Sequence, residues 1–222
     1  LFDSYYYTKN YKSYYRIPAI LNQGGKLWAF TDDRTNATGD IGTGKIKIIA
    51  KTSTDNGSTW DSNATTIANY KSSATSGFDY AHGDAAVVCD RGNSNNMLMM
   101  CASGNIGYGS STASAPIRVG KYISTDGGSK WTGTDVTNNI YGIWSSSTTN
   151  SITKLFFSSG RICQSAIINT GSYYRLYAAL CSNVGSLVVY SDDFGETWNA
   201  LGGVNALPVP NGNEAKIEEL PN

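Results

Sequence analysis

The chain has 222 residues, and its 17 basic side chains are balanced by 17 acidic ones, so no overall field attracts nucleic acid or an anionic membrane. The longest apolar runs, residues 85–89 and 97–102, are far too short to span a bilayer as a helix. Only 15% of residues are charged, and glycine, serine, threonine, asparagine and tyrosine are abundant. This composition is typical of short strands joined by tight turns, so we predict an all-β protein.

The first predicted strands each bring a charged side chain close to a loop. Arg16 precedes Ile17 and Pro18, and proline favours extended backbone at the residue before it. Arg34 follows a predicted strand over residues 26–31, and Asp40 comes six residues later in a loop rich in glycine and threonine. Each residue alone is typical of a solvated surface charge. Together they predict a cationic pocket with an acid at its rim, because functional groups gather where rigid strands end.

The cysteines and the single histidine do not form a metal-binding pattern. No CxxC spacing occurs, and His82 stands alone, so we predict neither a metal site nor a cofactor. We interpret His82 as a loop or packing residue. The four cysteines lie in or beside apolar runs and are predicted to be buried free thiols: Cys89, Cys101, Cys163 and Cys181.

An eight-residue pattern, S-x-D-x-G-x-T-W, occurs three times. It spans residues 53–60 and 191–198 in full, and residues 124–131 with Lys130 in place of the threonine. The aspartate can accept backbone N–H bonds in a tight turn, the glycine can adopt positive φ, and the tryptophan can pack onto the hairpin. Each copy follows a predicted strand, so each is expected to join the outer strands of one small antiparallel sheet. Such sheets, repeated at a steady spacing, predict the blades of a β-propeller.

The spacing of the repeats also bears on the size of the propeller. At about 70 residues per repeat, the chain would supply about three to four blades, whereas propellers close with roughly four to eight. We therefore expect residues 1–222 to be the N-terminal part of a single propeller, with no second domain. The remainder of the ring would come from C-terminal sequence or from a complementary chain.

The Tyr-Arg-Ile-Pro motif at residues 15–18, the spacing of Arg34 and Asp40, and the three repeats together resemble the bacterial-type exo-sialidases, or neuraminidases. The eight-residue units are similar to the structural Asp-box of that family. The resemblance covers nearly the whole chain and implies a six-bladed propeller of four-stranded antiparallel sheets. It also implies a secreted, periplasmic or cell-surface glycosidase that removes terminal sialic acid from glycans with retention of configuration.

The resemblance implies roles for individual residues. Arg16 matches one of the three arginines that bind the sugar carboxylate, and Arg34 matches a further arginine of the pocket floor. Asp40 matches the general acid/base. Asp84 matches the aspartate that contacts the amide or hydroxyl substituents of the sugar, with Asp79 as the alternative.

The resemblance also implies site residues in the second half of the chain. Glu214 matches the glutamate that accepts the proton of a nucleophilic tyrosine, although Glu218 and Glu219 are close alternatives. Gln164 is expected to line the site. The tyrosine and the two other carboxylate-binding arginines are expected beyond residue 222.

Three functions are compatible with this pattern. The first is hydrolysis of sialosides, and the second is transfer of the sialic acid to another acceptor by a trans-sialidase. The third is a non-catalytic propeller that binds glycans. The combination of Arg16, Arg34 and Asp40 favours an enzyme, because a pure binding module has no need for the acid.

Overall fold

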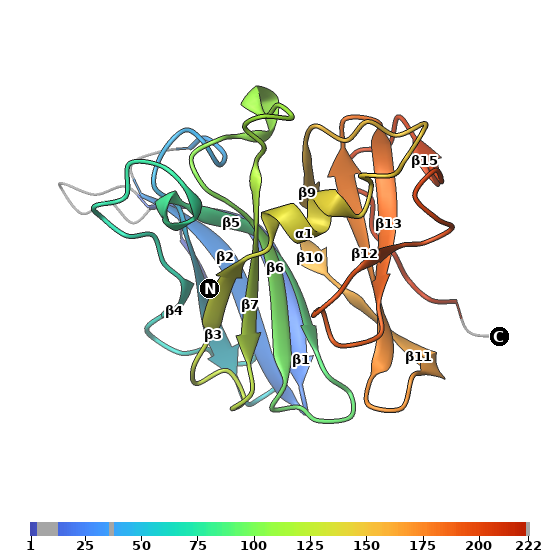
Figure 1. The fold of residues 1–222 in the computed structure, drawn as a ribbon. Coiled ribbons are helices and arrows are strands. Elements are labelled where there is room, and N and C mark those ends of the chain that lie inside the picture. Colours follow the sequence, from blue (N-terminus) through green and yellow to red (C-terminus); the bar gives the residue numbers. More distant parts are fainter. Residues whose placement is uncertain (4–12, 36–37, 221–222) are drawn as a thin grey trace.

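The computed structural model describes residues 1–3, 13–35 and 38–220, which form three mainly antiparallel β-sheets stacked side by side (Figure 1). Sheet 1 contains, in spatial order, β1 (Ser13–Gln23), β2 (Lys26–Thr35), β3 (Lys47–Ser53) and β4 (Thr65–Ala68). Sheet 2 contains β5 (His82–Cys89), β6 (Met97–Ser103), β7 (Arg118–Ser124) and β8 (Thr132–Asp135). Sheet 3 contains β11 (Cys163–Asn169), β12 (Tyr174–Ser182), β13 (Gly185–Ser191) and β14 (Asn199–Ala200).

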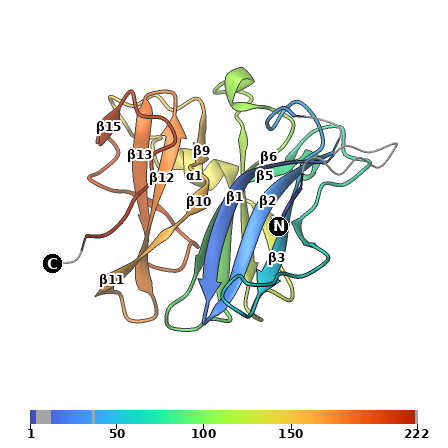
Figure 2. The same cartoon turned by 180° about the vertical axis from the view of Figure 1, so that it is seen from behind.

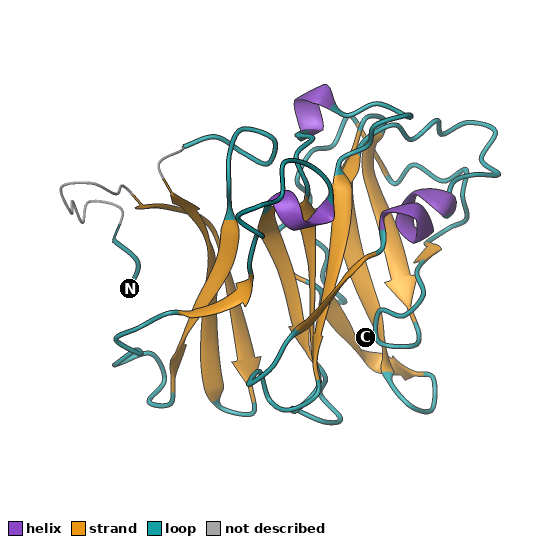
Figure 3. Ribbon diagram, turned by 60° about the vertical axis from the view of Figure 1, so that its left-hand side comes forward, coloured by secondary structure: helices purple, strands orange, loops and turns teal. Residues whose placement is uncertain are grey.

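Three short strands and three short helical segments complete the fold. The strand β10 (Gly160–Arg161) runs parallel to β5, while β9 (Leu155–Phe157) pairs with β12 and β15 (Val209–Pro210) pairs with β13. The helical turns η1 (Phe78–Tyr80), η2 (Tyr108–Ser110) and α1 (Thr137–Gly142) lie only in connections between strands (Figure 3). No helix in the described part of the chain is both long and apolar enough to cross a membrane.

The all-β prediction is confirmed, and sheet 1 has the expected four antiparallel strands. Sheet 2 is larger than expected because β10 joins it, and sheet 3 is larger because β9 and β15 join it. The first strands of sheets 1 and 2, β1 and β5, lie with β10 where the sheets meet (Figure 2). We call β1 and β5 the inner strands. The closed ring of six blades stays a prediction.

Strand β6 shows how the sheets stack. All of its residues are buried, so it reads as a continuous apolar run with no polar face. Met97, Met99 and Cys101 belong to the core shared with sheet 1, whereas Leu98 and Met100 belong to the core shared with sheet 3. Because successive side chains of a strand point to opposite faces, β6 and its sheet are covered on both sides.

Each eight-residue repeat joins the third and fourth strands of its sheet, as predicted. In the first repeat, Thr59 donates to the Asp55 carboxylate from its backbone N (2.8 Å) and its Oγ1 (2.6 Å). These hydrogen bonds lower the pKa of Asp55 to about 2. The first two tryptophans close their turns with an indole N–H bond to a glycine carbonyl. The third, Trp198, packs instead edge-on against Phe157 in the core.

The cysteines of the chain are not joined in disulfides. Three of them are buried, and Cys89 is half-buried. His82 is completely buried between Phe78 and Tyr122, in keeping with a packing role.

Candidate active site

A cavity of about 270 Å³ opens beside the first residues of the two inner strands. Sheets 1 and 2 contribute its charged side through β1 and β5, and sheet 3 contributes part of an apolar side. The lining residues are Arg16, Ile17, Asp40, Ile41, Asp84, Tyr108, Ile117, Phe156, Cys181, Asn213 and Glu214. Segments far apart in the sequence thus meet at one hollow.

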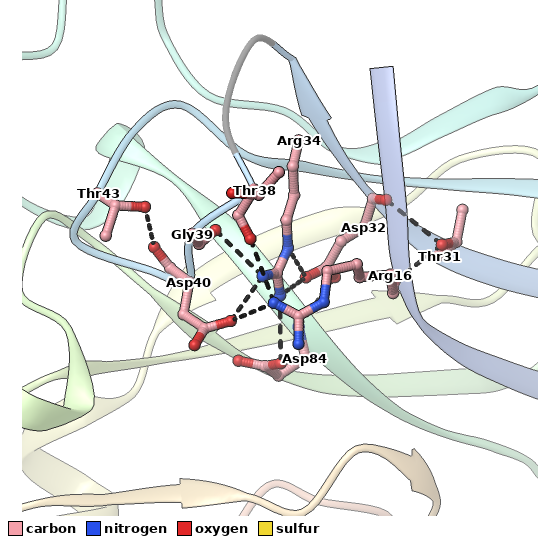
Figure 4. Close-up of polar contacts among 9 residues, drawn as sticks. All are labelled: Arg16, Thr31, Asp32, Arg34, Thr38, Gly39, Asp40, Thr43 and Asp84. Atoms are coloured by element: carbon pink, nitrogen blue, oxygen red, sulfur yellow. Dashed lines mark hydrogen bonds and ion pairs between the residues drawn. The ribbon is translucent and has the colours of Figure 1, made fainter. Parts of the chain in front are cut away.

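Asp40 connects the two predicted arginines at this cavity (Figure 4). Its Oδ1 accepts hydrogen bonds from Arg34 Nη1 at 2.6 Å and from Arg16 Nη1 at 3.2 Å. Thr43 closes the loop by donating from its Oγ1 to the Asp40 carbonyl at 2.7 Å. The Arg16 and Asp40 side chains are 47% and 71% exposed, so both are accessible to a ligand.

Arg34 is fully buried and forms an ion pair with Asp32, which is buried as well. Its Nε and Nη2 donate to Asp32 Oδ2 at 3.1 and 2.7 Å, and its Nη2 lies 3.9 Å from Asp84 Oδ1. Burial alone would lower the pKa of the Arg34 guanidinium, but its bonds to Asp32 and Asp40 outweigh that effect and raise it. Burial raises the pKa of Asp32 and of Asp84.

The inner strands carry an irregularity at the cavity. Ile17 has φ 57° and Asp84 has φ 60°, and each lies within a register shift of its strand pairing. The expectation that Pro18 keeps Ile17 extended is wrong, because the irregularity in β1 places Ile17 in the left-handed region instead. Left-handed backbone is costly for a side chain larger than glycine, and β-bulges often re-aim side chains near functional sites. Both irregularities occur where a polar residue reaches the cavity.

The opposite side of the cavity is apolar. Tyr108 stacks edge-on against Phe156, with ring centroids 5.4 Å apart, and Ile117 and Cys181 are buried beside them. Burial raises the pKa of the Tyr108 hydroxyl, so this phenol is a weaker candidate for a nucleophile than an ordinary tyrosine.

Glu214 reaches the cavity from the C-terminal segment. Neighbouring Asn213 fixes that segment, because its carbonyl accepts from Ser186 Oγ at 2.6 Å and its side chain accepts from Cys181 Sγ at 3.2 Å. The alternatives lie outside the cavity: Glu218 pairs with Arg161 at 2.9 Å, and Glu219 is bound by Ser165 and the Ala166 backbone. The described part of the chain after β15 forms no strand.

Asp79, the alternative to Asp84, also lies outside. Its carboxylate pairs with Lys71 at 2.6 Å, and it does not line the cavity.

The structure does not bring Gln164 to this cavity. Its side chain is buried, accepts from the Arg91 backbone N at 2.8 Å and donates to Asp90 at 3.1 Å. Gln164 lines a separate cavity of about 340 Å³, near the other ends of the inner strands. Its amide therefore ties sheet 3 to the loop after β5.

Sequence reasoning missed Asp32 and the apolar side. Asp32 and Arg34 are two positions apart on one strand, so their side chains share a face, and this spacing could have indicated the pair. Tyr108, Phe156 and Cys181 come from three separate elements or turns, and no local pattern brings them together. Among the described residues, no cluster of histidine, cysteine, aspartate and glutamate is suited to a metal ion.

The chain is similar in sequence to a known protein. No family model matches it. It is 31% identical over 214 residues to a sialidase of Paraclostridium sordellii, a match that covers 93% of this chain and 50% of the relative. The chain thus spans about half the length of that relative.

Solved structures share the fold at low sequence identity. The leech intramolecular trans-sialidase, solved with 2,7-anhydro-Neu5Ac, superposes with a TM-score of 0.71 at 15% identity. The match covers 94% of this chain and 46% of the leech chain. The intramolecular trans-sialidase of Ruminococcus gnavus gives 0.64 at 15% identity, covering 85% and 60%. The Trypanosoma rangeli sialidase in complex with the inhibitor DANA gives 0.59 at 20% identity, covering 85% and 30%. Over most of its length the chain is thus related in sequence to a bacterial sialidase.

Proposed function

We propose that the protein carrying this chain is a retaining exo-α-sialidase that removes terminal sialic acid from glycoconjugates outside the cytoplasm. The observation that carries this proposal is the meeting of Arg16, Asp40, Asp84 and Glu214 at one cavity. These residues come from β1, the following loop, β5 and the C-terminal segment. A surface of scattered solvated charges would not place them together.

The binding step follows from charge and geometry. Sialic acid carries a carboxylate on its anomeric carbon, and the planar guanidinium of Arg16 can bind such a group with two parallel hydrogen bonds. Arg16 is half-exposed at the cavity, so its donors can turn to a ligand. Asp84 would accept hydrogen bonds from the amide or hydroxyl groups of the sugar. Two further arginines, expected beyond residue 222, would complete the carboxylate site.

The chemical steps use an acid, a base and a neutral nucleophile. Glu214 would take the proton of a tyrosine hydroxyl, expected beyond residue 222, as its oxygen attacks the anomeric carbon. Asp40 would donate a proton to the departing glycosidic oxygen. Asp40 would then take a proton from water as that water displaces the tyrosine oxygen from the sugar, and the tyrosine oxygen would regain its proton from Glu214. Two displacements at one carbon give retention of configuration.

A neutral phenol suits this substrate better than a carboxylate nucleophile. The anomeric carbon bears a negative carboxylate, and a second carboxylate approaching it would be repelled. The position of Glu214 at the cavity supports this division of roles, because it keeps the base near the reacting carbon.

Product analysis tests the proposal. The intact protein is incubated with methylumbelliferyl α-sialoside and with sialyllactose, and proton NMR follows the sugar. Early release of the α-anomer of free sialic acid is the expected result. A new sialoside or an anhydro sugar would identify a trans-sialidase instead, and absence of any turnover would favour a non-catalytic glycan-binding propeller.

A further inference from the structure

Asp32 contacts Arg34, which binds Asp40 but does not itself line the cavity, and Asp84, which does line it. Asp32 lies outside the cavity lining as well. We infer that Asp32 is a positioning residue, which fixes Arg34 and Asp84 in the orientations needed for the reaction. The inference rests on the proposed function, since it assigns a role within that reaction.

The first contact fixes the arginine. Asp32 Oδ2 accepts from both Nε and Nη2 of Arg34, so one edge of the planar guanidinium is occupied. The remaining Nη1 is thereby directed at Asp40 and at the Gly39 carbonyl, at 2.6 and 3.1 Å. Because neither Asp32 nor Arg34 is exposed, the pair cannot exchange its bonds for bonds to water. The direction of Nη1 therefore depends on Asp32.

The second contact fixes the aspartate of the neighbouring sheet. Asp32 Oδ1 accepts from the backbone N of Asp84 at 3.0 Å, and Asp84 has the unusual φ of 60°. A backbone of this kind persists only where its surroundings hold it. Asp32 supplies a hydrogen bond at that residue, and so links β2 of sheet 1 to the irregularity in β5.

The packing at Gly83 shows that the carboxylate is closely enclosed. A Cβ added to Gly83 would lie 2.8 Å from Asp32 Oδ2, which is too close for both to keep their places. The absence of a side chain at Gly83 thus leaves the room that the carboxylate occupies. Gly83→Ala should displace the Asp32 carboxylate without removing its charge.

Two substitutions and a matched control test the role in the intact protein. Asp32→Asn keeps the size of the side chain but turns an amide N–H₂ or a neutral oxygen toward the Arg34 donors. Gly83→Ala perturbs the same carboxylate by contact. Asp33→Asn is the control, because Asp33 is also buried and lies next to Asp32 on β2, but its carboxylate pairs with Lys47 at 3.3 Å.

Binding of DANA and turnover of the fluorogenic sialoside are measured for all variants. With Asp32→Asn and Gly83→Ala, we expect kcat/KM to fall about 100-fold and the Kd for DANA to rise about tenfold, with unchanged stoichiometry. With Asp33→Asn, both constants should stay within about threefold of the native values. A purely structural role would lower the stoichiometry by unfolding part of the sample but leave the Kd unchanged.

Crystal structures of the variants provide a readout that does not require activity. In Asp32→Asn, or in Gly83→Ala if the first variant does not fold, we expect Asp84 to leave its left-handed conformation and Arg34 to release Asp40. Native Kd, native kcat/KM and unmoved Asp84 in a folded variant would overturn the inference alone. If Asp84 is displaced in the variant but the native protein neither turns over sialosides nor binds DANA, the proposed function is overturned and the positioning role of Asp32 stands.

Discussion

Arg34 Nη1 donates a hydrogen bond of 2.6 Å to Asp40 Oδ1, although the guanidinium is fully buried and the Asp40 side chain is 71% exposed. A buried cation therefore fixes one oxygen of an exposed acid. Within the described part of the chain, no hydrogen bond to the other oxygen of Asp40, Oδ2, is found. This arrangement suits a group that exchanges protons with a bound substrate.

Replacing Asp40 should impair the proton transfer more than the binding. We expect Asp40→Ala to lower kcat about 10²–10⁴-fold on sialyllactose, because its leaving group needs protonation. The loss should be much smaller on methylumbelliferyl sialoside, whose leaving group departs readily as an anion. Steady-state kinetics on the two substrates measure the difference. Equal losses on both would contradict the role of general acid.

Asp84 and Asp79 form a natural pair for a second test. Asp84 lines the cavity, whereas Asp79 pairs with Lys71 outside it. We expect Asp84→Asn to raise KM for sialosides or lower kcat/KM by about tenfold or more, through loss of a charged hydrogen-bond acceptor. Asp79→Asn should change neither by more than about twofold. The assignment of Asp84 would be wrong if the two variants had the same kinetics.

The features that could be predicted from sequence are those whose contacts are local. In the eight-residue repeats, the aspartate accepts a hydrogen bond from the residue four positions later, so the contacts that form the turn lie within one short segment. Arg34 and Asp40 are similarly joined across one loop. The sheets they belong to follow from apolar runs and turns, which are local as well.

The failures involve contacts that no local pattern specifies. Gln164 finds its partner in Asp90, 74 residues away, and so turns from the cavity it was expected to line. Phe156 and Cys181 become cavity residues only because sheet 3 stacks against sheet 2. At Ile17 a local rule was overridden, because the irregular pairing of β1 imposes a backbone that a following proline does not favour.

His82 should make the stability of the protein depend on pH. Burial lowers its pKa from 6.5 to about 4. Between these values the unfolded chain binds a proton that the folded protein does not, so the free energy of unfolding falls as the pH is lowered from 6.5 to 4. At pH 4 this effect has lowered the free energy of unfolding by about 3 kcal/mol.

The variant His82→Gln tests this effect. Glutamine keeps a hydrogen-bonding side chain but does not titrate, so the variant should lose less stability than the native protein between pH 7 and pH 4. Urea unfolding at both pH values measures the change, and comparing the two proteins cancels the opposite contributions of Asp32 and Asp84. Parallel loss of stability in both proteins would show that His82 does not titrate in this way.

The second repeat offers a stabilising substitution. Asp55 and Asp193 each accept a hydrogen bond from a threonine hydroxyl at 2.6 Å. Lys130 replaces that threonine in the second repeat, so Asp126 accepts only the backbone N–H bond of this residue, at 3.0 Å. Lys130→Thr should supply the missing hydroxyl and raise Tm by about 1–3 °C. Lys130→Val is the matched control, because valine has the same branched shape without the hydroxyl. Differential scanning calorimetry should rank threonine above valine; equal Tm values would mean that the hydroxyl bond adds nothing to this turn.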